Sequence, residues 1–129
     1  MFEMSAAAVA LAVPRLLLCG LDDALARQLE EALTDYRSLT CARMPEDAEQ
    51  CSRMIRESGA HAVFGPADPA ALKMLLDAAG GSAVPVIAVS HTADVRQWLD
   101  AMDAGAADCA APPFEARQLR WMLVSLNRA

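Results

Sequence analysis

Residues 84–114 read VPVIAVSHTADVRQWLDAMDAGAADCAAPPF, and this stretch decides the fold. Val84–Val89 is a wholly apolar run, as expected for a β-strand that is covered on both faces. Asp94 can cap a helix that runs to about Ala104 and ends at Gly105. Asp108–Ala111 then forms a short strand, which the following proline pair closes. The stretch therefore predicts a strand, a helix and another strand in succession.

The same alternation of short apolar runs and amphipathic stretches extends back to Arg15 and forward to about Asn127. The runs predict five strands: Leu16–Cys19, Arg37–Ala42, Ala62–Phe64, Val84–Val89 and Asp108–Ala111. Stretches with apolar residues every three or four positions predict five helices, which begin at Asp22 or Asp23, Pro45, Asp68-Pro69, Asp94 and Phe114. Glycines are expected to end three of these helices, at Gly59, Gly80-Gly81 and Gly105, and Gly65-Pro66 is expected to break the third strand.

Strict alternation of strands and helices predicts parallel strands joined by right-handed crossovers. For a chain of 129 residues we expect an α/β fold, a flavodoxin-like, doubly wound, five-stranded parallel sheet in the order 2-1-3-4-5. Helices on both faces make three layers. Ligands bind such a sheet at the carboxyl ends of its strands. Those ends are Gly20–Asp23, Gly65–Asp68, Ser90–Thr92 and Ala111–Pro113.

Length and charge limit the classes of function. The length of 129 residues corresponds to one domain, and an apolar content of 55% excludes general disorder. Lys plus Arg is 11 and Asp plus Glu is 17, which gives a net charge of −6. Lys73 is the one lysine, and no basic cluster offsets the acidic residues. Direct binding of nucleic acid is therefore not expected, because phosphate contacts need a concentrated basic surface.

The four cysteines, Cys19, Cys41, Cys51 and Cys109, form no CxxC pair, and neither histidine is spaced with them as in a zinc site. We interpret them as buried thiols in a reducing compartment. This interpretation predicts a cytoplasmic location, no metal and no cofactor. A redox or metal role for the thiols is the alternative.

Residues 1–14 are interpreted as a flexible leader that ends at Pro14, ahead of one domain over residues 15–129. The apolar run Ala6–Val13 is too short to span a bilayer, so no membrane span is expected. Glu3 stands where a signal peptide carries a basic residue. A dimer contact or a short helix in this run is the alternative.

The quoted stretch resembles the second half of a response-regulator receiver domain, a CheY-like domain. The family reads close to P-V-I-V-L-T-A and then A-M-x-A-G-A-x-D-Y-L-x-K-P-F, and the matching residues here are Pro85–His91, Ala101–Asp108 and Pro113-Phe114. Leu16–Leu33 is similar to the strand, acidic turn and helix that open a receiver. The resemblance covers about Arg15–Asn127. It implies a domain of two-component signal transduction with the fold predicted above, and a cis bond between Pro112 and Pro113.

The same resemblance implies an active site that this sequence lacks at most positions. Receivers use an aspartate that accepts phosphate, two acids that hold Mg²⁺, a Ser or Thr, and a Lys. The aligned residues are Gly20 and Leu21 for the acidic pair, Pro66 for the acceptor, Ser90 for the hydroxyl and Pro112 for the lysine. Proline offers no nucleophile, and a phosphoryl group would face no cation. We therefore predict a pseudo-receiver that is not an enzyme and works without phosphorylation.

An alternative is a working receiver with a displaced acidic pocket made by Asp22, Asp23 and Asp68, phosphorylated by a histidine kinase. The same three residues can instead cap helices. His91 follows Ser90, but neighbours on a strand point to opposite faces, so the two side chains are not expected to form a catalytic pair.

Receivers signal through their fourth helix, fifth strand and fifth helix. The resemblance implies a candidate interaction face that includes Trp98, Met102, Cys109 and Trp121, and a partner that is another protein or a second copy of this chain. Val95, Leu99 and Met102 recur at i, i+4 and i+7, which predicts that they point inward from the fourth helix. Trp98 lies one residue off that stripe and is interpreted either as an anchor for a partner or as a partly buried edge of the core. One of Trp121 and Met122 is expected in the core.

Overall fold

Five strands and five helices alternate along the part of the chain that the structure describes, a computed structural model covering residues 15–34, 36, 38–81 and 83–126. The strands are β1 (Arg15–Cys19), β2 (Ser38–Ala42), β3 (Ala62–Pro66), β4 (Val86–Val89) and β5 (Asp108–Ala110). The helices are α2 (Asp23–Ala32), α3 (Ala48–Ser58), α4 (Pro69–Gly80), α5 (Val95–Ala104) and α6 (Ala116–Leu126). The receiver's fourth and fifth helices are thus α5 and α6. The predicted leader over residues 1–14, and Asn127, lie outside the described residues.

All the strands are parallel, and their order is β2-β1-β3-β4-β5. This confirms the predicted doubly wound sheet. Leu17 pairs with Val63, Phe64 with Ile87, and Ala88 with Cys109, so the apolar centre of each strand meets the apolar centre of the next.

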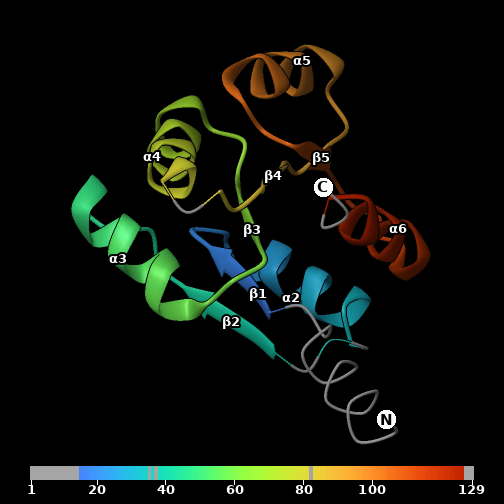
Figure 1. Cartoon of the computed structure of the whole chain (residues 1–129). Helices are drawn as coiled ribbons and strands as arrows, with labels where there is room; N and C mark the ends of the chain where they lie inside the picture. The colour runs from blue at the N-terminus through green and yellow to red at the C-terminus, as the bar shows by residue number, and fades with distance from the viewer. Residues whose placement is uncertain (1–14, 35, 37, 82, 127–129) are drawn as a thin grey trace, which may run out of the picture.

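Two layers of helices cover the sheet because residues along each strand alternate between its faces. On β1, Leu16 and Leu18 face a cluster with α2 and α6, whereas Leu17 and Cys19 face a cluster with α3, α4 and α5. Figure 1 shows α3 and α4 on one side of the strands and α6 on the other. No helix within the described residues is long and apolar enough to cross a membrane.

Aspartates begin four of the helices. Asp22, Asp68 and Asp94 accept hydrogen bonds from backbone N–H groups three residues ahead, as predicted. The prediction that Pro45 opens α3 is wrong. The helix begins at Ala48, because Asp47 Oδ1 accepts from Gln50 N at 2.8 Å and takes the capping role.

The predicted break of the third strand at Gly65-Pro66 is also wrong, since β3 runs through both residues. Gly65 is needed there because an added Cβ would lie 2.1 Å from Leu75 Cδ1 of α4. Pro66 is tolerated because β1 pairs with β3 only as far as Phe64, so the missing N–H falls beyond that ladder. The bond between Pro112 and Pro113 is cis, as the resemblance implied.

The orientation predicted for α5 is reversed. Val95, Leu99 and Met102 are 72%, 59% and 45% exposed, so they point outward. The core side of the helix instead carries Ala101, which is buried, and Trp98, which packs against the same cluster. Small Ala101 allows the helix to approach the sheet, which the aliphatic spacing alone did not reveal.

The thiols are free and mostly buried, with one exception to the prediction. Cys19, Cys51 and Cys109 are buried, but Cys41 is exposed on the edge strand β2. Burial raises the pKa of the Cys19 thiol to about 12, so it stays protonated and unreactive at neutral pH.

On α6, Met122 lies in the core and Trp121 is exposed. This confirms the prediction that one of these two residues is in the core.

Candidate functional site

A crevice of about 500 Å³ opens at the carboxyl ends of β1, β3 and β4. It is lined by residues of the three loops that follow these strands and by the first turns of the helices: Gly20, Leu21, Asp22, Leu25, Pro66, Ala67, Asp68, Pro69, Val89, Ser90, His91, Thr92 and Gln97. Of the five positions aligned with a receiver's active site, Gly20, Leu21, Pro66 and Ser90 meet here. Pro112 does not line the crevice.

The wall of the crevice at Gly20 is apolar. Gly20 has a φ of +74°, and a Cβ added there would lie 2.8 Å from Met44 Cε and 3.5 Å from Pro66 Cδ. Met44 and Pro66 therefore occupy the space around the position aligned with the first receiver acid. A carboxylate built at residue 20 would have to displace Met44.

Asp22 and His91 form a pair across the mouth of the crevice. Asp22 Oδ1 accepts from Leu25 N at 2.9 Å, and its Oδ2 contacts His91 Nε2. The bond from Leu25 and the contact with His91 both lower the pKa of Asp22 below its ordinary value. The pair joins the loop after β1 to the loop after β4. The sequence places His91 next to Ser90 and carries no signal for this contact with Asp22.

Of the other two acids of the displaced pocket, Asp68 lines the same crevice as Asp22, whereas Asp23 does not. Asp68 Oδ2 accepts from Ala71 N at 3.2 Å and caps α4. Asp23 lines a different groove, between α2 and β2. No cluster of three or more His, Cys, Asp or Glu side chains suited to a metal occurs within the described ranges. The Asp22 carboxylate is engaged by Leu25 N and His91, and the Asp68 carboxylate by Ala71 N, so a Mg²⁺ ion would compete with these contacts for its oxygen ligands.

Ser90 aligns with the Ser or Thr of a receiver, and its hydroxyl already takes part in two hydrogen bonds. Ser90 is 7% exposed, and its Oγ donates to the Thr92 carbonyl at 2.7 Å. The same oxygen accepts from Trp98 Nε1 at 2.9 Å. Cys109 Sγ contacts the Trp98 carbonyl at 3.7 Å, so Trp98 is held at both ends. The hydroxyl has a single proton, so an anion in the crevice could accept a hydrogen bond from Ser90 only by displacing the Thr92 carbonyl.

Comparison with known proteins supports this description at the level of the fold. No protein-family model and no curated sequence matches the chain. Among solved structures, a CheY-like protein (TadZ) from Pseudomonas aeruginosa has a TM-score of 0.73 at 17% identity, covering 88% of this chain and 99% of that one. The chain has the fold of a response-regulator receiver domain.

Two further solved structures have a similar fold. A pilus assembly-related protein from Burkholderia pseudomallei has a TM-score of 0.65 at 21% identity, covering 88% of this chain and 89% of its own. A response regulator from Chloroflexus aurantiacus has a TM-score of 0.63 at 18% identity, covering 88% of this chain and 97% of its own. These levels of identity establish a shared receiver fold.

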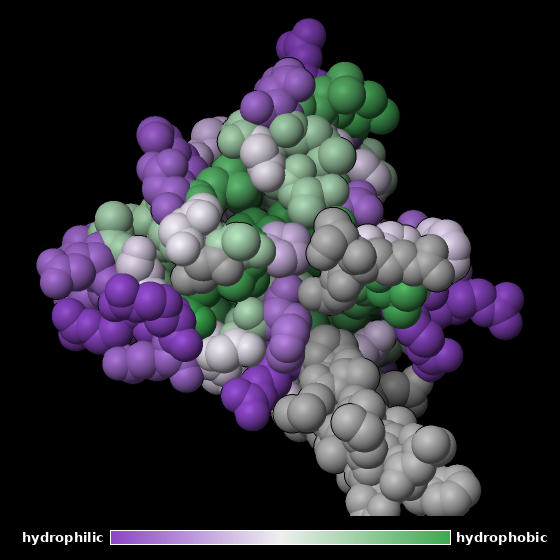
Figure 2. Space-filling view, viewed as in Figure 1, coloured by the Kyte–Doolittle hydropathy of each residue, from purple (hydrophilic) through white to green (hydrophobic). Residues whose placement is uncertain are grey.

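In this receiver fold α5 and α6 flank the edge strand β5, and both helices expose large apolar side chains. Val95, Leu99 and Met102 form what we name the outer α5 stripe, and Trp121 and Val124 are exposed on α6. Figure 2 shows hydrophobic surface at the top of the molecule, where Figure 1 places α5. Of the four residues predicted for an interaction face, Met102 and Trp121 are exposed, Trp98 is half-buried and Cys109 is buried.

Proposed function

We propose that this chain is a phosphorylation-independent protein-interaction module built on a receiver fold. The observation that carries the proposal is the state of Ser90, whose hydroxyl already donates to Thr92 and accepts from Trp98. In an active receiver that position must be free to bind the phosphoryl group. Here it is a fixed structural contact between the crevice and α5.

The charges around the crevice support the same proposal. The position aligned with the receiver lysine is Pro112, and Lys73 lies on α4 with its Nζ 3.0 Å from Asp77 Oδ2. A phosphoryl group at Asp68 would therefore add negative charge beside Asp22 without a neighbouring lysine. Like charges in one crevice raise the free energy of the phosphorylated form.

The proposed binding surface is the outer α5 stripe together with Trp121 and Val124. Large exposed apolar side chains are typical of surfaces that bind proteins, and tryptophan contributes strongly to such binding. The partner is another protein or a second copy of this chain. One similar structure is described as a response regulator and another as pilus assembly-related, so both settings are compatible with the proposal. We also propose a cytoplasmic location, which rests on the free thiols.

Treatment with acetyl phosphate and Mg²⁺ tests the proposal. We expect intact-mass spectrometry to find no gain of a phosphoryl group, because no acceptor carboxylate lies beside a metal site. An active receiver domain treated in parallel is the positive control. A gain of one phosphoryl group that disappears in an Asp68→Ala variant would instead establish a working receiver with a displaced acidic pocket.

A further inference from the structure

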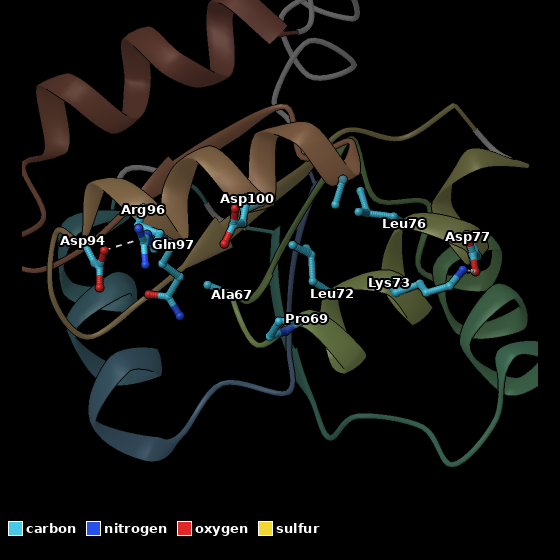
Figure 3. A pocket seen from close by; sticks show the side chains of 12 residues that line it. Ala67, Pro69, Leu72, Lys73, Leu76, Asp77, Asp94, Arg96, Gln97 and Asp100 are labelled. Atoms are coloured by element: carbon cyan, nitrogen blue, oxygen red, sulfur yellow. Dashed lines mark hydrogen bonds and ion pairs between the residues drawn. The ribbon is translucent and has the colours of Figure 1, made fainter.

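A groove of about 600 Å³ runs between α4 and α5, on the side of α5 opposite the outer α5 stripe. Figure 3 shows that side chains from both helices point into it. Its floor is apolar and consists of Ala67, Leu72, Leu76, Ala101 and Ala104. Its rim is charged and consists of Lys73, Asp77, Asp94, Arg96 and Asp100. We name this feature the α4–α5 groove.

The groove exists because α5 turns small residues toward α4. Ala101 and Ala104 line it, while the three large aliphatic side chains of the helix point outward. A methyl group reaches too short a distance from the helix axis to fill the space that a leucine would fill. Leu76 on α4 is consequently half-buried rather than covered.

The α4–α5 groove adjoins the crevice at the sheet edge. Ala67, Pro69 and Gln97 line both of them. A bound segment can therefore lie along the groove and place a side chain at its end in the crevice. The lining runs from Pro69 to Asp77 on α4 and from Asp94 to Ala104 on α5, which is roughly 12–15 Å at a rise of about 1.5 Å per residue.

The electrostatics of this combined lining favour a positively charged occupant. Five carboxylates line it, from Asp22, Asp68, Asp77, Asp94 and Asp100, against the two cations Lys73 and Arg96, a formal balance of −3 with His91 neutral. Three of the acids cap helices whose N-termini each carry about half a positive charge. That offset still leaves the lining negative by about 1.5 charges. Asp100 forms no ion pair within the described residues, and the whole chain carries −6.

We propose that the α4–α5 groove binds a basic amphipathic helix of a protein partner. Two to three turns of such a helix match the length of the lining, and apolar residues at i, i+3 or i+4, and i+7 would cover the alanine and leucine floor. Its Lys or Arg side chains would face Asp94 and Asp100, and a terminal one would reach Asp22 or Asp68. This site is separate from the outer α5 stripe, because the two lie on opposite sides of α5.

Peptide selection on the full chain tests the proposal. A phage-displayed library of random peptides of about 16 residues, roughly four helical turns, is selected on the protein, and the dissociation constants of the enriched peptides are measured. We expect enriched peptides to carry net positive charge and helical apolar spacing. Ala104→Arg places a large cation in the groove and should weaken binding roughly tenfold or more. Asp100→Lys reverses a rim charge and should weaken binding and lower its salt dependence.

Two control variants make the result specific. Ala70→Arg adds the same charge on an exposed part of α4 outside the groove and should change the dissociation constant less than about twofold. Leu99→Asp changes the outer α5 stripe and should likewise leave peptide binding unchanged. Failure to enrich any peptide, enrichment of acidic peptides, or binding that ignores Ala104→Arg would overturn the proposal. Binding lost in Leu99→Asp alone would overturn it too, while supporting the surface described under the proposed function.

Discussion

Ser90 joins the crevice to α5, because its hydroxyl oxygen contacts both the Thr92 carbonyl and Trp98 Nε1. The ring N–H of Trp98 can only donate a hydrogen bond. Because the ring packs against the core, this donor needs an acceptor, and the Ser90 hydroxyl oxygen provides one. The contact therefore fixes how α5 sits over the sheet edge. The residue that aligns with the receiver Ser or Thr therefore contributes to the packing of α5 in this chain.

Trp98→Phe tests this contact at the residue scale. Phenylalanine keeps an aromatic ring but removes the donor, and Ser90 retains its bond to Thr92, so we expect the free energy of unfolding to fall by about 1 kcal/mol. Urea unfolding followed by circular dichroism measures the change. Trp121→Phe is the matched control, because that ring is 68% exposed, and should stay within about 0.5 kcal/mol of the parent. Equal effects of the two substitutions would refute the structural role of the Ser90 contact.

The site residues divide into those that sequence can identify and those that it cannot. Gly20, Pro66 and Ser90 could be placed at one edge of the sheet, because each follows or ends a strand and parallel strands share that edge. The contact of Asp22 with His91 could not be predicted, because it depends on how two loops 69 residues apart bend toward each other. The cap at Asp22 was predictable because it depends only on local spacing.

The orientation of α5 shows the limit of periodicity at the element scale. Three aliphatic residues at helical spacing define one face, but the pattern does not say whether that face meets the core or a partner. Here the contact of Trp98 with Ser90 and the small size of Ala101 decide the rotation of the helix. As a result, the aliphatic face of α5 is exposed to solvent, and the α4–α5 groove lies on the opposite side of the helix.

The same substitution on the two sides of α5 tests this rotation. Leu99→Asp places a carboxylate on the exposed side and should change the free energy of unfolding by less than about 0.5 kcal/mol. Ala101→Asp buries an unpaired carboxylate at a residue that is 3% exposed and should cost at least about 2 kcal/mol. Thermal or urea unfolding of both variants gives the comparison. The opposite ranking would mean that the aliphatic stripe faces the core.

At the scale of the whole molecule, the order of elements and the strand order were predictable, because alternating strands and helices leave few ways to cover both faces of a parallel sheet. The residues at which the helices and strands begin and end were less predictable. α3 begins three residues after Pro45, because capping by Asp47 outweighs the preference of proline for a first turn. Which of two neighbouring residues begins a helix depends on the backbone geometry, and the amino-acid sequence alone does not determine that geometry.

The two apolar clusters share the strands between them, so they should unfold together. Ile55 belongs to the cluster under α3 and α4, and Ile87 belongs to the cluster under α2 and α6. Because both side chains are buried, Ile→Val at either residue should lower the free energy of unfolding by about 0.5–1.5 kcal/mol without changing the dependence on denaturant. The double variant should lose the sum of the two values, since the residues lie on opposite faces of the sheet. Two separate transitions, or a change in denaturant dependence in one variant only, would mean that one helical layer unfolds before the other.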